Sequence, residues 1–578
     1  MIITLMIGLL MFIMFSIVGI AVQSLFENSA LSDRKGGKLF DSVWLGIVTF
    51  SVYAQIYSLF GAVSEGAVLG ALLLTGGIFL FFHKKYLRLV KELLAWQNGT
   101  VNKRIIRIIL FGVCVIVALS WGVQGIGHYD TYLYHAQNIR WIEEYGIVKG
   151  LGNLHNRFAY NSSFMCIQTL FSFKWLLGQS LHTLNTFLWV FMMTYAAGTI
   201  QLFKTGKVLL SDFLKLLIFL YLCSESVFST LSSPHTDMMT LLLVAYILTR
   251  WVELQECGEK EITTYGLLCL LGVFAVSVKL SAVLVLVLVI RPMIILIREK
   301  NWKSISMFLG GGILIILPFL IRNIILSGYL VYPYASIDLF NVDWKMPSFQ
   351  VAFDNHEIIA WGRKLNDVYR YSEPMSVWLP NWLKNVEIYE AAFMLLNIML
   401  IPVSICMLLL RLRNKEYNEC LVLLCITVLF AGWFFTAPLP RYGMVYLYMI
   451  PLYYLWIIFE KMASRFKKNW MSKIAFSAFL FVGSAYTLAG VKELSLEEYL
   501  LLPADYGTYF EMQCIEWNGI KIYAPKNGDQ GNYEEFPAIP YSARLELIEF
   551  CGDDMGDGFR MKEIYRDKKV TPYGDVLD

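Results

Sequence analysis

Long apolar stretches separated by shorter polar ones run along the chain from its first residues to about position 490. A helix needs about 20 predominantly apolar residues to cross a bilayer, and fourteen stretches come close to that length. We therefore predict an all-α polytopic membrane protein with about fourteen transmembrane helices. The predicted spans cover approximately residues 2–22, 41–57, 67–82, 105–122, 180–202, 211–229, 237–250, 264–278, 280–297, 304–325, 390–410, 419–436, 443–459 and 473–489.

The composition agrees with this pattern. The 578-residue chain is 57% hydrophobic and only 16% charged, whereas soluble domains carry about 25% charged residues. The N-terminal run over residues 1–22 lacks the basic start and the small-residue cleavage site of a signal peptide, so we expect it to remain as a span. The lipid bilayer is thus the first partner that the sequence predicts.

The net charge of +3 averages two unlike regions. From Lys492 to Asp578 there are 18 acidic and 9 basic residues, a net charge of −9, which leaves +12 on the remainder. Basic runs such as "IREKNWK" (297–303) and "RLRNK" (411–415) stand beside spans. Positively charged cytoplasmic loops explain this arrangement, and we expect no nucleic-acid partner.

We expect the protein in the cytoplasmic (inner) membrane, with its basic loops on the cytoplasmic side. This orientation puts the N-terminus outside, together with three polar segments: loops 123–163 and 326–389 and the tail after residue 490. The apolar segment 164–178 would move two basic loops outside if it crossed the membrane. We therefore expect an interfacial or re-entrant helix there.

This topology divides the chain into three parts: an N-terminal three-helix membrane segment (1–104), a transmembrane core (105–490) and an extracytoplasmic C-terminal cap (491–578). The cap contains "CIEWNGIKIYAP", whose alternation around Asn518-Gly519 predicts a β-hairpin. We expect a small, partly β structure that is too short to bury much core alone. The sequence leaves open whether Cys514 and Cys551 form a disulfide.

The first outer loop predicts an amphipathic surface helix, because apolar residues recur in it near helical spacing. These residues are Tyr134, Ile139, Ile142 and Ile147. The second outer loop is rich in Trp, Tyr, Pro and Asn, and we expect no further span within it.

Five ionisable residues from separate places in the chain fall at the predicted outer interface. Insertion of such a group into a span costs about 2.5–3.5 kcal/mol, so each one requires an explanation. Taken singly, the cations could extend to the headgroups, and the acid of the seventh span could cap its helix. Independent snorkelling does not require two acids among three bases on one face, so we predict a single cluster. Its members are Asp130, Asp237, Lys279, Arg322 and Arg441.

The stretch "GHYDTYLYH" (127–135) surrounds Asp130 with three further candidate substrate contacts, His128, Tyr134 and His135. The two histidines could pair on a metal ion, but we expect them to form hydrogen bonds and predict no metal site. The remaining histidines of the core, His155, His182 and His235, are expected to be structural. The cysteines show no metal-binding spacing.

Such a cluster suits transfer from a lipid phosphate. Arg and Lys bind phosphate oxygens through charge-assisted hydrogen bonds and stabilise the negative charge that develops as a phosphate departs. The acceptor hydroxyl needs a base, and a nearby aspartate can supply one. We predict that Asp130 has this role.

These features resemble the GT-C superfamily of polytopic glycosyltransferases, which use polyprenyl-phosphate-linked sugars. The resemblance rests on an aspartate in the first large outer loop, a short amphipathic helix after it, a second acid after the next outward span and a K-x-S hairpin at Lys279. The segments "RN…SGYLVYP" (322–333) and "PRYG" (440–443) are also similar, and the likeness covers about residues 105–460. The whole chain also resembles an uncharacterised bacterial membrane-protein family with "DTxLYH" and a C-terminal segment here spanning Tyr523–Gln530, which implies no activity.

By this resemblance, Asp130 matches the first-loop catalytic acid of the superfamily and Asp237 its second-loop acid. Lys279 and Arg441 match its lipid-phosphate contacts. The acids do not form a D-x-D or D-E pair, which leaves open whether a divalent cation takes part.

The function that we expect is sugar transfer from a polyprenyl-phosphate donor to a glycan, lipid or protein acceptor in cell-envelope glycan synthesis, with inversion at the sugar. A transporter or flippase of lipid-linked glycans, a polysaccharide polymerase and a non-catalytic assembly factor remain as alternatives. A transporter is less favoured, because its charges would lie near the midplane of the membrane.

Overall fold

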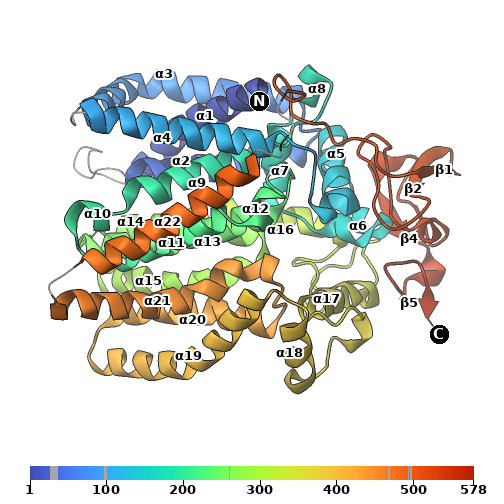
Figure 1. Ribbon diagram of the computed structural model, residues 1–578. Helices are drawn as coiled ribbons and strands as arrows, with labels where there is room; N and C mark the ends of the chain where they lie inside the picture. The colour runs from blue at the N-terminus through green and yellow to red at the C-terminus, as the bar shows by residue number, and fades with distance from the viewer. Residues whose placement is uncertain are drawn as a thin grey trace.

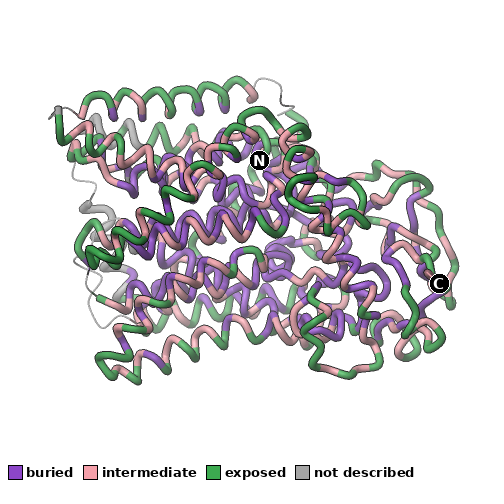
Figure 2. Tube along the Cα trace, turned by 90° about the horizontal axis from the view of Figure 1, so that it is seen from below, coloured by how far each residue is buried: buried purple, intermediate pink, exposed green. Residues whose placement is uncertain are grey.

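The structure, a computed structural model, describes residues 1–26, 37–96, 101–259, 261–466, 469–491, 494 and 497–577. Long helices lie side by side in a bundle, and short helices, loops and the strands of the tail gather at one end of it (Figure 1). We call this end the cap end. Buried residues follow the central helices of the bundle, and exposed residues lie along the outward faces of the peripheral ones (Figure 2).

The helices of the bundle are α1 (Ile2–Phe26), α2 (Gly37–Ser58), α3 (Glu65–Trp96), α4 (Val101–Gly122), α9 (Leu184–Thr199), α11 (Leu210–Leu222), α13 (Thr236–Glu256), α14 (Ile262–Val278), the 3₁₀ segment η4 (Leu280–Val289) with α15 (Ile290–Arg298), α16 (Trp302–Ser327), α19 (Ile388–Arg413), α20 (Tyr417–Phe435), α21 (Pro440–Phe466) and α22 (Trp470–Val491). The shorter helices are η2 (Thr131–His135), α5 (Ala136–Glu144), α6 (Leu151–Leu154), η3 (Asn156–Ala159), α7 (Ser163–Leu170), α8 (Lys174–Leu177), α10 (Leu202–Thr205), α12 (Glu225–Phe228), α17 (Ser348–Gly362), η5 (Val368–Arg370) and α18 (Met375–Lys384), with η6 (Ser542–Glu546), η7 (Met555–Asp557) and η8 (Glu563–Tyr565) in the tail.

Among the described residues, ten helices are long and apolar enough to cross a membrane. Peripheral helices expose large apolar side chains such as Leu73 (76% exposed), Phe81 (81%) and Phe481 (73%). Contiguous apolar surface of this kind is unusual on a soluble monomer. The chain is therefore a mostly helical, multi-pass membrane protein.

The number of fourteen spans stays a prediction. Every predicted span overlaps a helix, but the ten membrane-crossing helices do not include α11, α13 and α14, nor α4, whose described apolar part covers only residues 108–122. α13 is buried along most of its length, at the centre of the bundle. Such a helix does not need a lipid-compatible surface, which explains its lower apolar content.

The segment predicted to be interfacial or re-entrant consists of two short helices, α7 and α8. Helix α7 ends at Leu170 with Phe171 as its C-cap, and Phe173, which precedes α8, has a left-handed conformation with φ of 51°. At about 1.5 Å of rise per residue, the eight residues of α7 are much too short to cross a bilayer.

The three segments predicted to share one face of the membrane meet at the cap end. One hydrophobic cluster joins Trp141 and Leu151 of the first loop, Leu326 at the end of α16, and Ile522 and Phe559 of the tail. The chain start lies at the same end, because the backbone N–H of Ile2 donates to the carbonyl of Leu500 at 3.0 Å. These segments therefore lie together at one end of the bundle, and the side of the membrane that this end faces stays a prediction.

The tail contains the predicted hairpin. Strands β1 (Met512–Trp517) and β2 (Ile520–Pro525) pair antiparallel, and Trp517 lies opposite Ile520. The two turn residues, Asn518 and Gly519, have φ of 48° and 81°, as a type I′ turn requires. Two further two-stranded sheets complete the tail, β3 (Ile548–Phe550) with β4 (Phe559–Met561) and β5 (Lys569–Val570) with β6 (Val576–Leu577). Cys514 and Cys551 are free thiols.

The predicted second outer loop, residues 326–389, contains the helices α17, η5 and α18. One prediction about the first outer loop was wrong. The amphipathic helix α5 does not lie on the surface, since the tail covers its polar face: Gln137 Nε2 donates to the carbonyl of Asn532 at 2.8 Å, and Arg140 NH1 donates to that of Tyr533 at 2.8 Å. The spacing of apolar residues that predicted α5 contains no information about the tail, so the packing of the tail on α5 could not be predicted from it.

Candidate functional site

Four of the five predicted cluster residues meet at the cap end of the bundle, each at the end of a helix. Asp237 stands in the first turn of α13, and Lys279 directly follows α14. Arg441 is the second residue of α21, and Asp130 immediately precedes η2. Residues more than 300 positions apart in the sequence therefore share one site.

Arg441 is the centre of this cluster. Its NH2 donates to Asp130 Oδ2 at 2.8 Å, and its Nε lies 3.3 Å from Asp237 Oδ2. The other oxygen of Asp237 accepts a hydrogen bond from Lys279 Nζ. The Lys279 ammonium also lies 3.9 Å from the centre of the Tyr442 ring, which adds a cation–π contact. Two acids and two bases thus form one continuous ion-pair network.

Local sequence explains these positions. Lys279 is extended (φ −155°, ψ 128°) and separates α14 from η4 without any hydrophilic loop, which brings its side chain to the helix ends. Pro440 begins α21, as proline favours the first position of a helix. A carboxylate in the first turn, such as Asp237, is stabilised by the N-terminal partial charge of α13.

Helix capping does not account for Asp237, because the N-cap of α13 is His235. Asp130 is the N-cap of η2 but makes no side-chain capping hydrogen bond there. The Asp130 carboxylate contacts Arg441 instead. Burial acts to raise the pKa of Asp130, but the Arg441 guanidinium outweighs it and holds that pKa below its ordinary value. Asp130 is therefore ionised at neutral pH.

Three buried histidines surround the network. His128 Nε2 lies 4.0 Å from Asp237 Oδ2, its ring stacks on that of His235 with 4.7 Å between centres, and the ring of His135 lies 5.6 Å away. Burial lowers the pKa of each to about 3, helped by the charge of Arg441 at His128. All three are neutral at pH 7, and nitrogens of each have no hydrogen-bond partner among the described residues.

One set of ligand atoms could hold a metal ion. The nearest atoms of His128, His235 and Asp237 lie within 4.8 Å of one another, and all three residues are buried. Two histidines and a carboxylate are a ligand set that suits zinc. Lys279 and Arg441 already neutralise Asp237, however, and their charges oppose a cation there.

A cavity of about 880 Å³ opens at the cluster, and Asp130, Asp237 and Arg441 line it. We call it the cleft. Its walls come from the first loop, the segment before α13, the α17–α19 region, the start of α21 and the tail. A volume near the upper end of the ordinary range for ligand pockets is large enough for a substrate of several rings.

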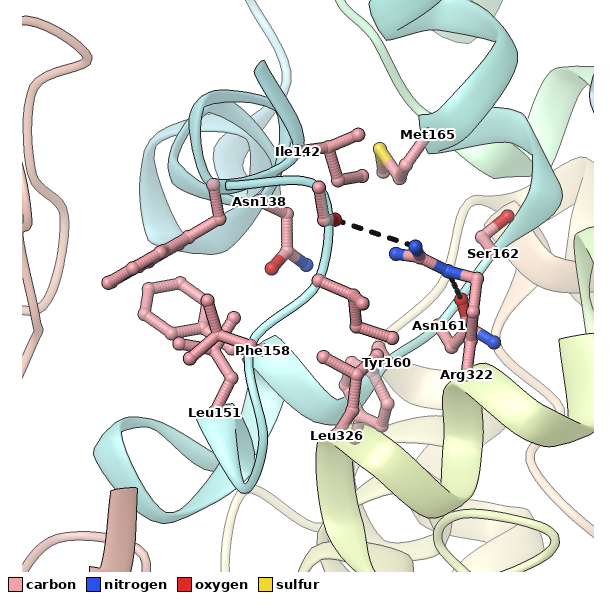
Figure 3. Close-up of a pocket in the computed structure, with 14 residues that line it drawn as sticks. Asn138, Ile142, Leu151, Phe158, Tyr160, Asn161, Ser162, Met165, Arg322 and Leu326 are labelled. Atoms are coloured by element: carbon pink, nitrogen blue, oxygen red, sulfur yellow. Dashed lines mark hydrogen bonds between the residues drawn. The ribbon is translucent and has the colours of Figure 1, made fainter. Parts of the chain in front are cut away.

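The other predicted site residues lie elsewhere. Arg322 of α16 is buried and contacts Asn161 Oδ1 at 3.1 Å and the carbonyl of Gly146 at 3.5 Å (Figure 3). It also donates to the hydroxyl of Ser58. It joins three segments of the protein and is not among the residues that line the cleft. Tyr134 and His135 are not lining residues either; their rings lie 4.3 Å apart behind Asp130.

The sequence prediction missed several cleft residues. His235 was expected to be structural but stacks on His128, and its position two residues before Asp237 was an available signal. Arg157 lines the cleft near Asp130, and nothing in the sequence distinguishes it from the other charged residues of the first loop. The tail contributes Asp529, Tyr541 and Tyr573, which only the three-dimensional fold brings to the site.

A protein family described as a domain of unknown function, DUF8201, matches residues 1–448. The matched region contains all the charged residues of the cluster and ends before the tail. No curated protein and no solved structure matches the chain.

Proposed function

The chain belongs to the DUF8201 family, and we propose from its site that it is a membrane glycosyltransferase. In this proposal it moves a sugar from a polyprenyl-phosphate-linked donor to an acceptor at the outer face of the cytoplasmic membrane, in cell-envelope glycan synthesis. The observation that carries the proposal is the network of Asp130, Asp237, Lys279 and Arg441. Asp130, Asp237 and Arg441 line a large cleft, and Lys279 pairs with Asp237 behind its lining.

The position of this network favours an enzyme at the membrane surface. Each of the four residues stands at the end of a helix, beside the segments that form the cap end. A lipid-linked donor held with its chain in the bilayer would present its phosphate at such a position. A transporter or flippase would need its charges near the middle of the spans.

The proposed step is a displacement at the anomeric carbon. The acceptor hydroxyl oxygen forms a bond to that carbon as the bond to the phosphate oxygen of the donor breaks. The bonding electrons leave with the polyprenyl phosphate, and the hydroxyl proton passes to the Asp130 carboxylate. Attack opposite the leaving group inverts the configuration. Arg441 and Lys279 stabilise the charge that develops on the phosphate.

The ion pairs make the basicity of Asp130 depend on whether the donor phosphate is bound. Without donor, Arg441 holds Asp130 ionised but weakly basic, because a carboxylate paired with a guanidinium has little affinity for a proton. A phosphate that binds Arg441 competes with Asp130 for the same donors. Asp130 then regains basicity while substrate is present. Asp237 keeps Lys279 and Arg441 in place between turnovers.

Binding of a long-chain polyprenyl phosphate to the full-length protein in nanodiscs tests the proposal, with the matching polyprenol as a ligand control. Native mass spectrometry should detect the phosphate and little of the alcohol. Arg441→Met and Lys279→Met should each weaken phosphate binding about tenfold or more, the loss expected for a charge-assisted contact. Arg441→Lys and Lys279→Arg should retain more of it.

Arg413→Met is the matched control, because Arg413 is exposed at the far end of α19. Arg413→Met should bind like the wild type. Equal binding of phosphate and alcohol, or unchanged phosphate binding in both cluster variants, would contradict the proposal.

A further inference from the structure

The cleft continues past Asp130 into a region lined by aromatic rings and carboxylates. Tyr129, Tyr541 and Tyr573 stand here with Glu357, Asp529 and Arg157. Tyr129 and Arg157 come from the first loop and Glu357 from α17. The other three come from the tail. We call this region the aromatic half of the cleft.

The tail is fastened across this half by two hydrogen bonds from tyrosine to carboxylate. Tyr129 Oη donates to Asp529 Oδ1 at 2.5 Å, and Tyr573 Oη donates to Glu357. Gln530 Nε2 also donates to the carbonyl of Tyr129 at 2.8 Å. The residue next to Asp130 is thereby tied to the tail, and the tyrosine rings are held in fixed orientations.

Arg157 has unused hydrogen-bonding capacity in this region. Among the described residues its guanidinium donates no hydrogen bond, and its one ion pair, with Glu357 Oε2, is long at 3.8 Å. A guanidinium carries five N–H donors. Arg157 lies close enough to both Asp130 and Tyr541 for its charge to favour the ionised form of each.

We infer that the aromatic half binds a saccharide, and that the acceptor is therefore a glycan whose hydroxyl is presented to Asp130. Tyr541 supplies a ring face for the C–H side of a sugar. Arg157, Glu357 and Asp529 supply the donors and acceptors that hydroxyl groups require. The assignment of this saccharide as acceptor rests on the proposed function; the binding site itself does not.

The chemistry of the lining favours a saccharide over the other acceptors. A lipid tail would need an apolar lining, whereas each of the six residues of the aromatic half carries a hydroxyl, carboxylate or guanidinium. Tyr129 is 53% exposed and the nearby Trp361 is 48% exposed, both toward the cleft. A sugar ring has apolar C–H faces and a rim of hydroxyl groups. Exposed aromatic rings suit the faces, and the neighbouring carboxylates can accept hydrogen bonds from the hydroxyl groups.

Saturation-transfer NMR on the full-length protein in nanodiscs tests this inference. The probes are the methyl glycosides of glucose, galactose, mannose, N-acetylglucosamine, rhamnose and glucuronic acid, with the peptide Gly-Ser-Thr-Gly beside them. At least one glycoside should receive saturation at its ring protons. Tyr541→Ala should reduce that signal about fivefold, while Tyr541→Phe, which keeps the ring, should retain most of it.

Tyr417→Ala serves as the matched control, because Tyr417 is 62% exposed at the start of α20, on the other side of the bundle from the cap end. It should leave the signal unchanged. Saturation of the peptide but of no glycoside, no saturation of any probe, or an undiminished glycoside signal in a folded Tyr541→Ala variant would overturn the inference. Polyprenyl-phosphate binding, measured on the same samples, separates this failure from a failure of the proposed function.

Discussion

Two ion-pair networks of similar composition lie at opposite ends of the bundle. The cap-end network consists of Asp130, Asp237, Lys279 and Arg441. The second, which we call the distal network, consists of Asp41, Lys215, Arg250 and Glu253. Arg250 follows Asp237 by 13 residues on α13, which corresponds to about 20 Å along a helix axis. Each network has two acids and two bases.

The distal network is closed on itself. Arg250 pairs with Asp41 and Glu253 at 3.1 Å each, and Lys215 Nζ lies 2.5 Å from Glu253 Oε1. Tyrosine hydroxyls complete both carboxylates: Tyr246 donates to Asp41 at 2.6 Å and Tyr195 to Glu253 at 3.0 Å. None of its four charged side chains is more than 14% exposed or lines the cleft.

The cap-end network is open. The Arg441 side chain is 34% exposed, and the network borders a cavity beside histidines with unpartnered nitrogens. Charge pairing alone therefore does not mark a binding site, because both networks have it. What distinguishes the cap end is unused hydrogen-bonding capacity next to space for a ligand. We therefore propose that the distal network stabilises the fold and that the cap-end network binds and converts the substrate.

The largest effect on stability should come from the distal network. Arg250→Met leaves Asp41 without its cationic partner in a buried site, and breaking a buried pair costs about 3–5 kcal/mol. We expect a clear fall in melting temperature and in yield, with normal polyprenyl-phosphate binding per folded molecule. A stable Arg250→Met protein that has lost lipid binding would reverse the assignment of the two networks.

The matched substitution Asp→Asn should separate the networks by activity. Asp130→Asn keeps the shape of the side chain but cannot accept a proton, so turnover should fall by about 10²-fold or more, with little change in melting temperature. Asp41→Asn should do the opposite, lowering the melting temperature while turnover per folded molecule persists. Near-normal turnover of Asp130→Asn would end the assignment of Asp130 as the base.

Acid should weaken the cap end through its histidines. Their pKa is lowered to about 3 in the folded protein from 6.5, so between these values the unfolded chain binds more protons than the folded one. Stability should then fall as pH decreases from 6.5 toward 3. The melting temperature of His128→Gln should decline less steeply over this range than that of the wild type. Parallel declines would show that these rings do not titrate as described.

The smallest effect is expected from chelation. Lys279 and Arg441 already supply positive charge at Asp237, so excess EDTA should leave polyprenyl-phosphate binding within about twofold of its original value. A larger loss that Mn²⁺ or Zn²⁺ restores, and that His235→Ala reproduces, would instead make His128, His235 and Asp237 metal ligands.

Local sequence patterns predicted local structure well. The Asn518-Gly519 turn, the break at Lys279 and the apolar character of the long helices all depend on neighbouring residues. Helices α17 and α18 were missed because they are short and lie among prolines and polar residues. α18 even contains Pro380 in its interior.

Contacts between distant segments were harder to predict. Arg322 and Arg441 look alike in the sequence, as cations at the end of a span, yet Arg322 is enclosed by Ser58, Gly146 and Asn161 while Arg441 faces the cleft. The distal network went unnoticed because its members are scattered over three helices, α2, α11 and α13. Sequence predicted which residues needed partners, and only the fold shows which partners they have.

The most direct test of the central claim is a density map of the full-length protein with a bound polyprenyl phosphate. The phosphate should lie within hydrogen-bond distance of Arg441 and Lys279, with its lipid chain among the spans. The contact between Arg441 NH2 and Asp130, 2.8 Å in the free protein, should lengthen as the phosphate takes its place. A phosphate bound away from Arg441, or bound there with the Asp130 contact unchanged, would contradict this account.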